Sequence, residues 1–177
     1  EFFGEYGLHS LAKGDPAYDP ADVDNGGPGA CTSFPPNIAI RLYQAGQPRA
    51  AEDLMRRCLW WGSRMPYWGD SIYAARADYR RDTPLQCTID GVAVAQFFIF
   101  GMFGVDPQFD GRILVRPRLA AFAPNAALRG VKIREAVFDI ELGDTEFKVL
   151  SGGKTVVAPV GRMISIKKNG KATELQI

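Results

Sequence analysis

The feature that constrains the fold of this chain most is a change in the spacing of apolar residues near residue 105. Before this point apolar residues recur at helical spacing between proline, serine and glycine signals, and after it they form short runs rich in β-branched residues. The first spacing is typical of helices and the second of strands. The sequence therefore predicts a helical part over residues 1–105 and a small β module over residues 106–177.

Three helices are expected in the first part, over residues 34–45, 48–62 and 90–104. Ser33 can cap the first and Asp90 the third, and a glycine follows or closes each helix. The first and third are apolar on nearly every face, so we expect protein to surround them. The second has one charged face and is expected on the outside.

The three predicted helices are in turn buried, amphipathic and buried. A double ring of helices, in which inner helices alternate with outer ones, produces this order. Three helices cannot close such a ring. The chain also begins at Glu1 rather than at methionine. We therefore expect it to be the C-terminal portion of a larger protein, with the missing N-terminal portion as its partner.

The β module is predicted to be a small antiparallel β-sandwich. Turn signals such as Gly143-Asp144 and Asn169-Gly170 separate its strands, and the second is typical of a type I′ hairpin. The predicted strands are 113–115, 131–133, 137–142, 146–150, 155–157 and 163–166.

Charge and cysteine content argue against several kinds of partner. The 21 basic and 20 acidic side chains give a net charge of +1, with no basic stripe for nucleic acid. The longest apolar stretch, 92–103, is too short to span a bilayer. The three cysteines are widely spaced and lack the pattern of a zinc site. We expect no nucleic acid or membrane partner, and no metal or cofactor.

Two long connections, 13–32 and 62–89, both lead into the N-terminal ends of helices, so we expect them to meet at one end of the helical part. Long loops in compact domains are usually functional. The first connection carries Asp24 and Asn25 among stiffening prolines and permissive glycines. A calcium loop and a purely structural loop are the alternatives, although the spacing fits no EF-hand.

The second connection combines aromatic rings with charged groups. Tyr67, Trp68, Tyr73 and Arg80 are candidate substrate-binding residues, and Asp70 is a candidate catalytic carboxylate. Flat aromatic faces beside carboxylates and guanidinium groups suit a sugar, which offers a C–H face and hydroxyl groups. The alternative is that these rings only cover the core of the outer helix.

Candidate acid–base groups are few. Asp90 is the candidate base, because a helix N-terminus stabilises the charged carboxylate, although plain capping is the alternative. Glu5 is a further candidate catalytic carboxylate. His9, the only histidine, is a candidate for substrate binding, and a structural hydrogen bond is its commoner role.

The segments TPLQCTIDG at 83–91 and GMFGVDPQFDGRILVRPRL at 101–119 resemble the end of the catalytic barrel in six-hairpin glycosidases of the (α/α)6 type. The nearest likeness is to inverting α-L-fucosidases, and LRGVKIREAVFDIELGD at 128–144 is similar to the start of their β module. The resemblance implies the last hairpins of an (α/α)6 barrel, Asp90 in the base machinery, and a periplasmic or extracellular location. Gln86 is a further candidate substrate-binding residue.

The expected function is the inverting hydrolysis of a glycosidic bond in an oligo- or polysaccharide, with the isolated chain inactive. The first alternative is a polysaccharide lyase of the helical-toroid type, with Tyr73, Tyr79, Arg76 and Arg80 as its candidates. The second is a non-catalytic carbohydrate-binding or assembly domain.

Overall fold

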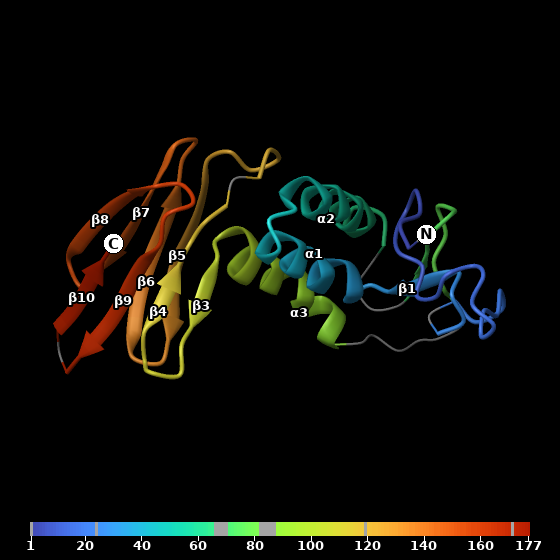
Figure 1. Ribbon diagram of the computed structural model, residues 1–177, viewed down its shortest axis with the longest axis horizontal. Helices are drawn as coiled ribbons and strands as arrows, with labels where there is room; N and C mark the ends of the chain where they lie inside the picture. Colours follow the sequence, from blue (N-terminus) through green and yellow to red (C-terminus); the bar gives the residue numbers. More distant parts are fainter. Residues whose placement is uncertain (1, 24, 66–70, 82–87, 119, 171) are drawn as a thin grey trace. The chain divides into compact units, whose positions relative to one another are not determined.

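The computed structural model describes residues 2–23, 25–65, 71–81, 88–118, 120–170 and 172–177 (Figure 1). The chain divides into two compact units, Glu1–Phe97 and Phe98–Ile177. The first contains the helices and a small sheet, and the second is built from strands.

The first unit is built on three helices, α1 (Phe34–Gln44), α2 (Pro48–Gly62) and α3 (Thr88–Gln96). Prolines near the starts of α1 and α2 fit the first turn, where the missing N–H has no partner to lose. The helices α1 and α2 pack against each other, and α1 also contacts α3. No helix in the described part of the chain is long and apolar enough to cross a bilayer.

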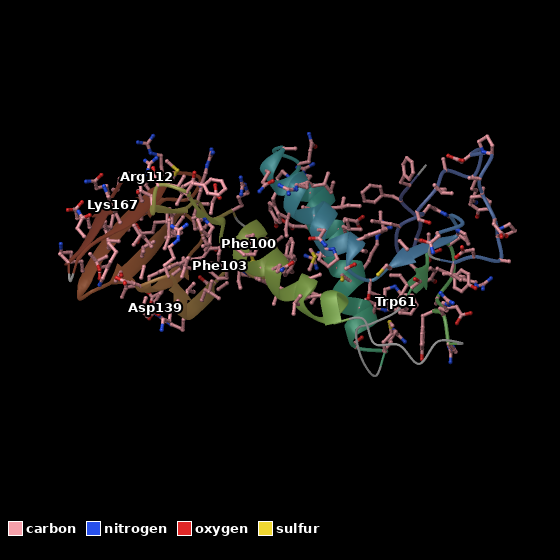
Figure 2. All side chains as sticks on the ribbon, turned by 90° about the horizontal axis from the view of Figure 1, so that it is seen from below. Trp61, Phe100, Phe103, Arg112, Asp139 and Lys167 are labelled. Carbon is pink, nitrogen blue, oxygen red and sulfur yellow. The ribbon has the colours of Figure 1, made fainter. Side chains whose placement is uncertain are left out.

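Two segments far apart in the sequence form a two-stranded antiparallel sheet in this unit. Strand β1 (Gly29–Cys31) pairs with β2 (Ser71–Tyr73), and Ala30 lies opposite Ile72. The buried Trp61 of α2 (Figure 2) packs with Met65 and with Ile72 of β2, and its indole Nε1 donates a hydrogen bond to the Tyr6 carbonyl at 2.8 Å. The aromatic cluster therefore ties the N-terminal segment to α2 and the sheet.

A π-helix, η1 (Phe97–Met102), continues from α3. The strands that follow form two four-stranded antiparallel sheets, ordered β10-β9-β4-β3 and β5-β6-β7-β8 in the described residues. The strands are β3 (Val105–Pro107), β4 (Ile113–Val115), β5 (Ala126–Ile133), β6 (Ala136–Leu142), β7 (Glu146–Ser151), β8 (Lys154–Pro159), β9 (Ile164–Asn169) and β10 (Ala172–Gln176).

Alternate side chains of these strands are buried, as expected for sheets with one face in a core. Phe138 and Ile140 on β6, Phe147 on β7 and Ile164 and Ile166 on β9 are almost fully buried. Strand β6 lies near β9, and β8 near β10, so the two sheets share a core.

A β-bulge interrupts the pairing of β5 with β6. Leu128 lies opposite Ile140 and Val131 opposite Phe138, so Arg129 and Gly130 both face Asp139. The Gly130 N–H donates to Asp139 Oδ1 at 2.7 Å, which supplies the partner that the interrupted ladder does not. Asp139 (Figure 2) is therefore the residue that holds the bulge.

The prediction of helical hairpins from an (α/α)6 barrel is wrong. The described residues contain three short α-helices, one π-helix and ten strands in three antiparallel sheets. The two helices expected to be buried all round are not: Phe34 and Ile38 on α1 are 47% and 39% exposed, and Val92 on α3 is 46% exposed. The expected likeness to six-hairpin glycosidases and α-L-fucosidases therefore has no support in the observed architecture.

Candidate functional site

A pocket of about 630 Å³ lies in the first unit. Its wall comes from residues 21–23 and Asn25, which precede β1, and from Tyr73, at the end of β2, with residues 78–81. The pairing of β1 with β2 brings these two segments together. The volume is in the range of small-molecule sites. The polar and aromatic lining residues are Asp22, Asn25, Tyr73, Asp78, Tyr79, Arg80 and Arg81.

The acidic segment before β1 is shaped by its own aspartates. The carboxylates of Asp15, Asp19 and Asp22 accept the backbone N–H groups of residues 17, 21 and 25 at 2.8, 2.9 and 3.3 Å. The Asp19 N–H donates to the Gly26 carbonyl at 2.8 Å and closes the loop. Such local bonds favour turns over regular structure. Of these three carboxylates, Asp22 lines the pocket.

The second wall is a short chain reversal that follows β2. The Tyr73 N–H donates to the Asp78 carbonyl at 3.0 Å, and the Arg80 N–H donates to the Ser71 carbonyl at 2.9 Å. An antiparallel bridge joins Ile72 to Tyr79. These backbone contacts place both tyrosines on the pocket wall.

Two guanidinium groups cover the two tyrosine rings. The Cζ of Arg76 lies 3.5 Å from the centre of the Tyr73 ring, and the Cζ of Arg81 lies 4.4 Å from that of Tyr79. Both distances allow a cation–π interaction. Each arginine therefore has a flat aromatic surface that limits the orientation of its planar group.

Asp78 lies between these two arginines. Its Oδ1 accepts the Tyr79 N–H at 2.9 Å and lies 3.3 Å from Arg81 Nη2, and its Oδ2 lies 3.6 Å from Arg76 Nε. Exposed ion pairs of this kind contribute about 0–1 kcal/mol each to stability. Their effect here is geometric, because one carboxylate positions two stacked guanidinium groups.

Three of the predicted substrate-binding residues, Asn25, Tyr73 and Arg80, line this one pocket. Asp90 lies in α3, but its side chain is outside what the structure describes. Five other predicted site residues lie outside the described residues: Asp24, Tyr67, Trp68, Asp70 and Gln86. Their roles stay predictions.

His9 and Glu5 lie away from the pocket wall. His9 is buried, and its Nδ1 donates to the Gly27 carbonyl at 3.0 Å, which anchors the segment that leads into β1. Glu5 is exposed, and its hydrogen bond to Tyr6, followed by its negative charge, raises the pKa of the Tyr6 phenol. Both contacts support local structure in this conformation.

Two lining residues of the pocket, Asp22 and Asp78, are not among the site residues predicted from the sequence. The signal for Asp78 is its place in the string Arg76-Ala-Asp-Tyr-Arg-Arg, where one carboxylate stands among three cations. Among the described residues no group of three or more His, Cys, Asp or Glu side chains could hold a metal ion.

Neither a comparison with protein-family models nor a search of curated proteins gives a match for this chain. The geometry of the pocket is therefore the basis for assigning a function.

Proposed function

We propose that the pocket binds one sugar residue of an oligo- or polysaccharide. The observation that supports this function is the meeting of two tyrosine rings, guanidinium groups and two carboxylates in a pocket of about 630 Å³. A pyranose ring is amphipathic: its C–H face packs on aromatic rings, and its hydroxyl groups bond to charged partners. The pocket lining contains both kinds of residue, and an arginine covers one face of each tyrosine ring.

The binding proposal is tested by replacing Tyr73 with alanine. We expect affinity for the best sugar ligand to fall about tenfold, because an aromatic contact contributes about 0.5–1.5 kcal/mol beyond its buried area. Isothermal calorimetry or affinity electrophoresis over a panel of soluble polysaccharides measures this loss.

Phe109→Ala is the matched control, because Phe109 is a fully exposed aromatic residue in the second unit. We expect this variant to bind as the unchanged protein does. Equal affinity of the Tyr73→Ala variant, or binding to no member of the panel, would contradict the proposal.

Glycosidic hydrolysis at the same pocket is the second proposal, and the presence of Asp22 and Asp78 on its two walls favours it. Glycosidases generally use two carboxyl groups, one to protonate the leaving oxygen and the other to activate water or attack the sugar. Asp78 also positions the arginines, so its replacement would disturb binding as well as chemistry. Asp22 gives the clearer test.

We expect Asp22→Asn to lower turnover by at least a hundredfold, the smaller end of the usual effect of a general acid or base. The release of reducing ends from a polysaccharide that binds measures it. Asp19→Asn is the control, because Asp19 makes the same kind of backbone bond in the same loop without lining the pocket. Unchanged turnover in the Asp22→Asn variant would show that this residue takes no part in the reaction. If the product is an unsaturated sugar that absorbs ultraviolet light, the reaction is an elimination and not a hydrolysis.

A further inference from the structure

We propose that one end of the second unit docks on an anionic lipid surface, with Phe109 as its apolar anchor. Four hairpin turns form this surface, those of β3–β4, β5–β6, β7–β8 and β9–β10, with flanking residues, over 108–112, 132–137, 151–154 and 167–174. We call these residues the turn end. They belong to a different unit from the sugar pocket, so neither proposal depends on the other.

Strand pairing and side-chain bonds bring the four turns together. Strand β4 is antiparallel to β3 and β9, and β9 to β10, so the β3–β4 and β9–β10 turns lie at the same end of one sheet (Figure 1). The β7–β8 turn lies beside them, because Lys154 Nζ donates to the Thr173 carbonyl at 2.9 Å. Ser151 Oγ donates to the Val137 carbonyl at 2.7 Å, which holds the β5–β6 turn beside the β7–β8 turn.

Phe109 is fully exposed at the tip of the β3–β4 turn. The backbone of this turn is held on both sides of the ring: the Gln108 N–H donates to the Arg112 carbonyl at 2.8 Å, and the Gly111 N–H donates to the Gln108 carbonyl at 3.2 Å. Asp110 Oδ1 also accepts the Arg112 N–H at 3.1 Å. A well-supported turn therefore presents a large apolar ring to water, and moving such a ring into an apolar environment is favourable.

The turn end also carries a surplus of positive charge. Its four ranges contain seven lysines and arginines and three acidic residues. Lys168 has an interaction of its own, and Lys171 lies outside the described residues. Without these two lysines, five basic residues still outnumber the three acidic ones. The other residue of this unit outside the described part is Leu119, so no acidic group of the unit is left out.

Two of the three acidic groups already have partners within the turn end. Asp110 Oδ2 lies 2.7 Å from Arg112 Nε, and Glu174 Oε1 accepts a hydrogen bond from Asn169 Nδ2 at 2.6 Å. The exposed cations of the turn end that form no ion pair with another described residue are Lys132, Arg134, Lys154 and Lys167 (Lys167 is labelled in Figure 2). The turn end therefore suits an anionic partner.

An anionic lipid surface offers both kinds of contact at once. Its headgroups attract lysine and arginine side chains, and the boundary between headgroups and acyl chains accepts an apolar ring. Phe109 is the only aromatic residue in the four ranges, whereas single-stranded nucleic acid is generally bound on several aromatic rings in succession. A lone apolar ring among cations therefore favours lipid over nucleic acid.

The expectation of no membrane partner was drawn from the net charge of the whole chain and from the length of its apolar stretches. Docking on a lipid surface depends instead on local charge and on an apolar anchor. Both of these are features of the turn end alone.

The test is co-sedimentation of the whole chain with vesicles of phosphatidylcholine alone, and of phosphatidylcholine and phosphatidylglycerol in equal parts. We expect at least tenfold tighter binding to the anionic vesicles, and we expect added salt to reduce this difference. Phe109→Ala should weaken binding to the anionic vesicles about tenfold, because burial of the ring is lost. Met163→Ala is the matched control and should bind as the unchanged protein does, since Met163 is an exposed apolar residue between β8 and β9, at the opposite end of β9.

Two further variants locate the contact. Lys167→Gln should weaken binding to the anionic vesicles about fivefold, because a positive charge is lost near the lipid surface. Lys148→Gln is its control, since Lys148 is an exposed lysine within β7 and outside the turn end. Phe109→Trp should keep the affinity and add a tryptophan whose emission is quenched by brominated acyl chains, beyond any quenching seen in the unchanged protein.

Three outcomes would overturn the proposal. The first is unchanged vesicle binding by a Phe109→Ala variant whose melting temperature equals that of the unchanged protein. The second is equal binding to neutral and anionic vesicles. The third is binding to dextran sulfate or single-stranded DNA, weakened by Lys167→Gln, with no binding to any vesicle; the turn end would then be a site for soluble polyanions.

Discussion

Gly29 has no side chain at the place where the two walls of the pocket are joined. A Cβ at this position would lie 2.1 Å from the backbone carbonyl oxygen of Ile72, across the β1–β2 pair. Backbone atoms cannot yield as a flexible side chain can, so an added methyl group must push the strands apart. The close approach of β1 to β2 therefore depends on this glycine.

We expect Gly29→Ala to destabilise the first unit by more than about 1 kcal/mol, because the clash is with backbone, and to weaken sugar binding. Thermal unfolding and the polysaccharide titrations measure the two effects. Gly14→Ala is the control, since a Cβ there would meet no atom within 4 Å. Equal melting temperatures for Gly29→Ala and Gly14→Ala would show that β1 and β2 can move apart without loss of stability.

The site could be predicted in part from residue types. Asn25, Tyr73 and Arg80 were expected because polar and aromatic residues gather in two long connections, and the structure places these three on one pocket. Asp78 stands among arginines in the sequence, but its importance comes from lying between Arg76 and Arg81 in space. Sequence spacing does not show how a chain reversal will orient side chains.

At the scale of secondary structure, local signals were more informative than patterns that depend on neighbours. The predicted helix over 48–62 coincides with α2, because proline and glycine mark its ends in the sequence itself. The third predicted helix, 90–104, is α-helical only in part: α3 ends at Gln96 and continues as η1. The Phe103 N–H donates a hydrogen bond to the Phe98 carbonyl at 2.9 Å. This bond spans five residues, as in a π-helix, whereas an α-helical bond spans four.

The barrel prediction failed because it was an inference about packing partners. Apolar residues on several faces of a helix show that burial is favourable, but they do not show what covers each face. The described part of the chain pairs residues 29–31 with residues 71–73 as strands, a long-range contact that no local pattern in either connection announces. The six short runs predicted as strands fall largely within β4 to β9, since their turns are marked by local sequence.

At the scale of the whole molecule, the two compact units contain different spectroscopic reporters. The three tryptophans, Trp60, Trp61 and Trp68, all lie in the first unit, whereas the two four-stranded sheets lie in the second. Tryptophan fluorescence therefore reports on one unit, and strand circular dichroism is dominated by the other. Multi-domain chains often unfold in more than one step.

We expect Asp139→Ala to destabilise the second unit by on the order of 1 kcal/mol, because it removes the hydrogen bond that holds the bulge. In urea, the midpoint followed by circular dichroism should fall while the midpoint followed by tryptophan fluorescence stays the same. Glu135→Ala, at an exposed turn of the same hairpin, is the control. A parallel shift of both midpoints would show that the units unfold together.

The bulge in β5 has a further consequence for how copies of this protein behave together. Strand β5 is the edge of its sheet, and an edge with regular, unpaired N–H and C=O groups can accept a strand from another molecule. The two residues at the bulge break that regular spacing, and Arg129 adds a charge there that pairs with Glu141 at 2.7 Å. Because bulges and charges at sheet edges disfavour pairing with another chain, we expect Asp139 and its glycine partner to make intermolecular strand exchange and fibril growth at this edge less favourable.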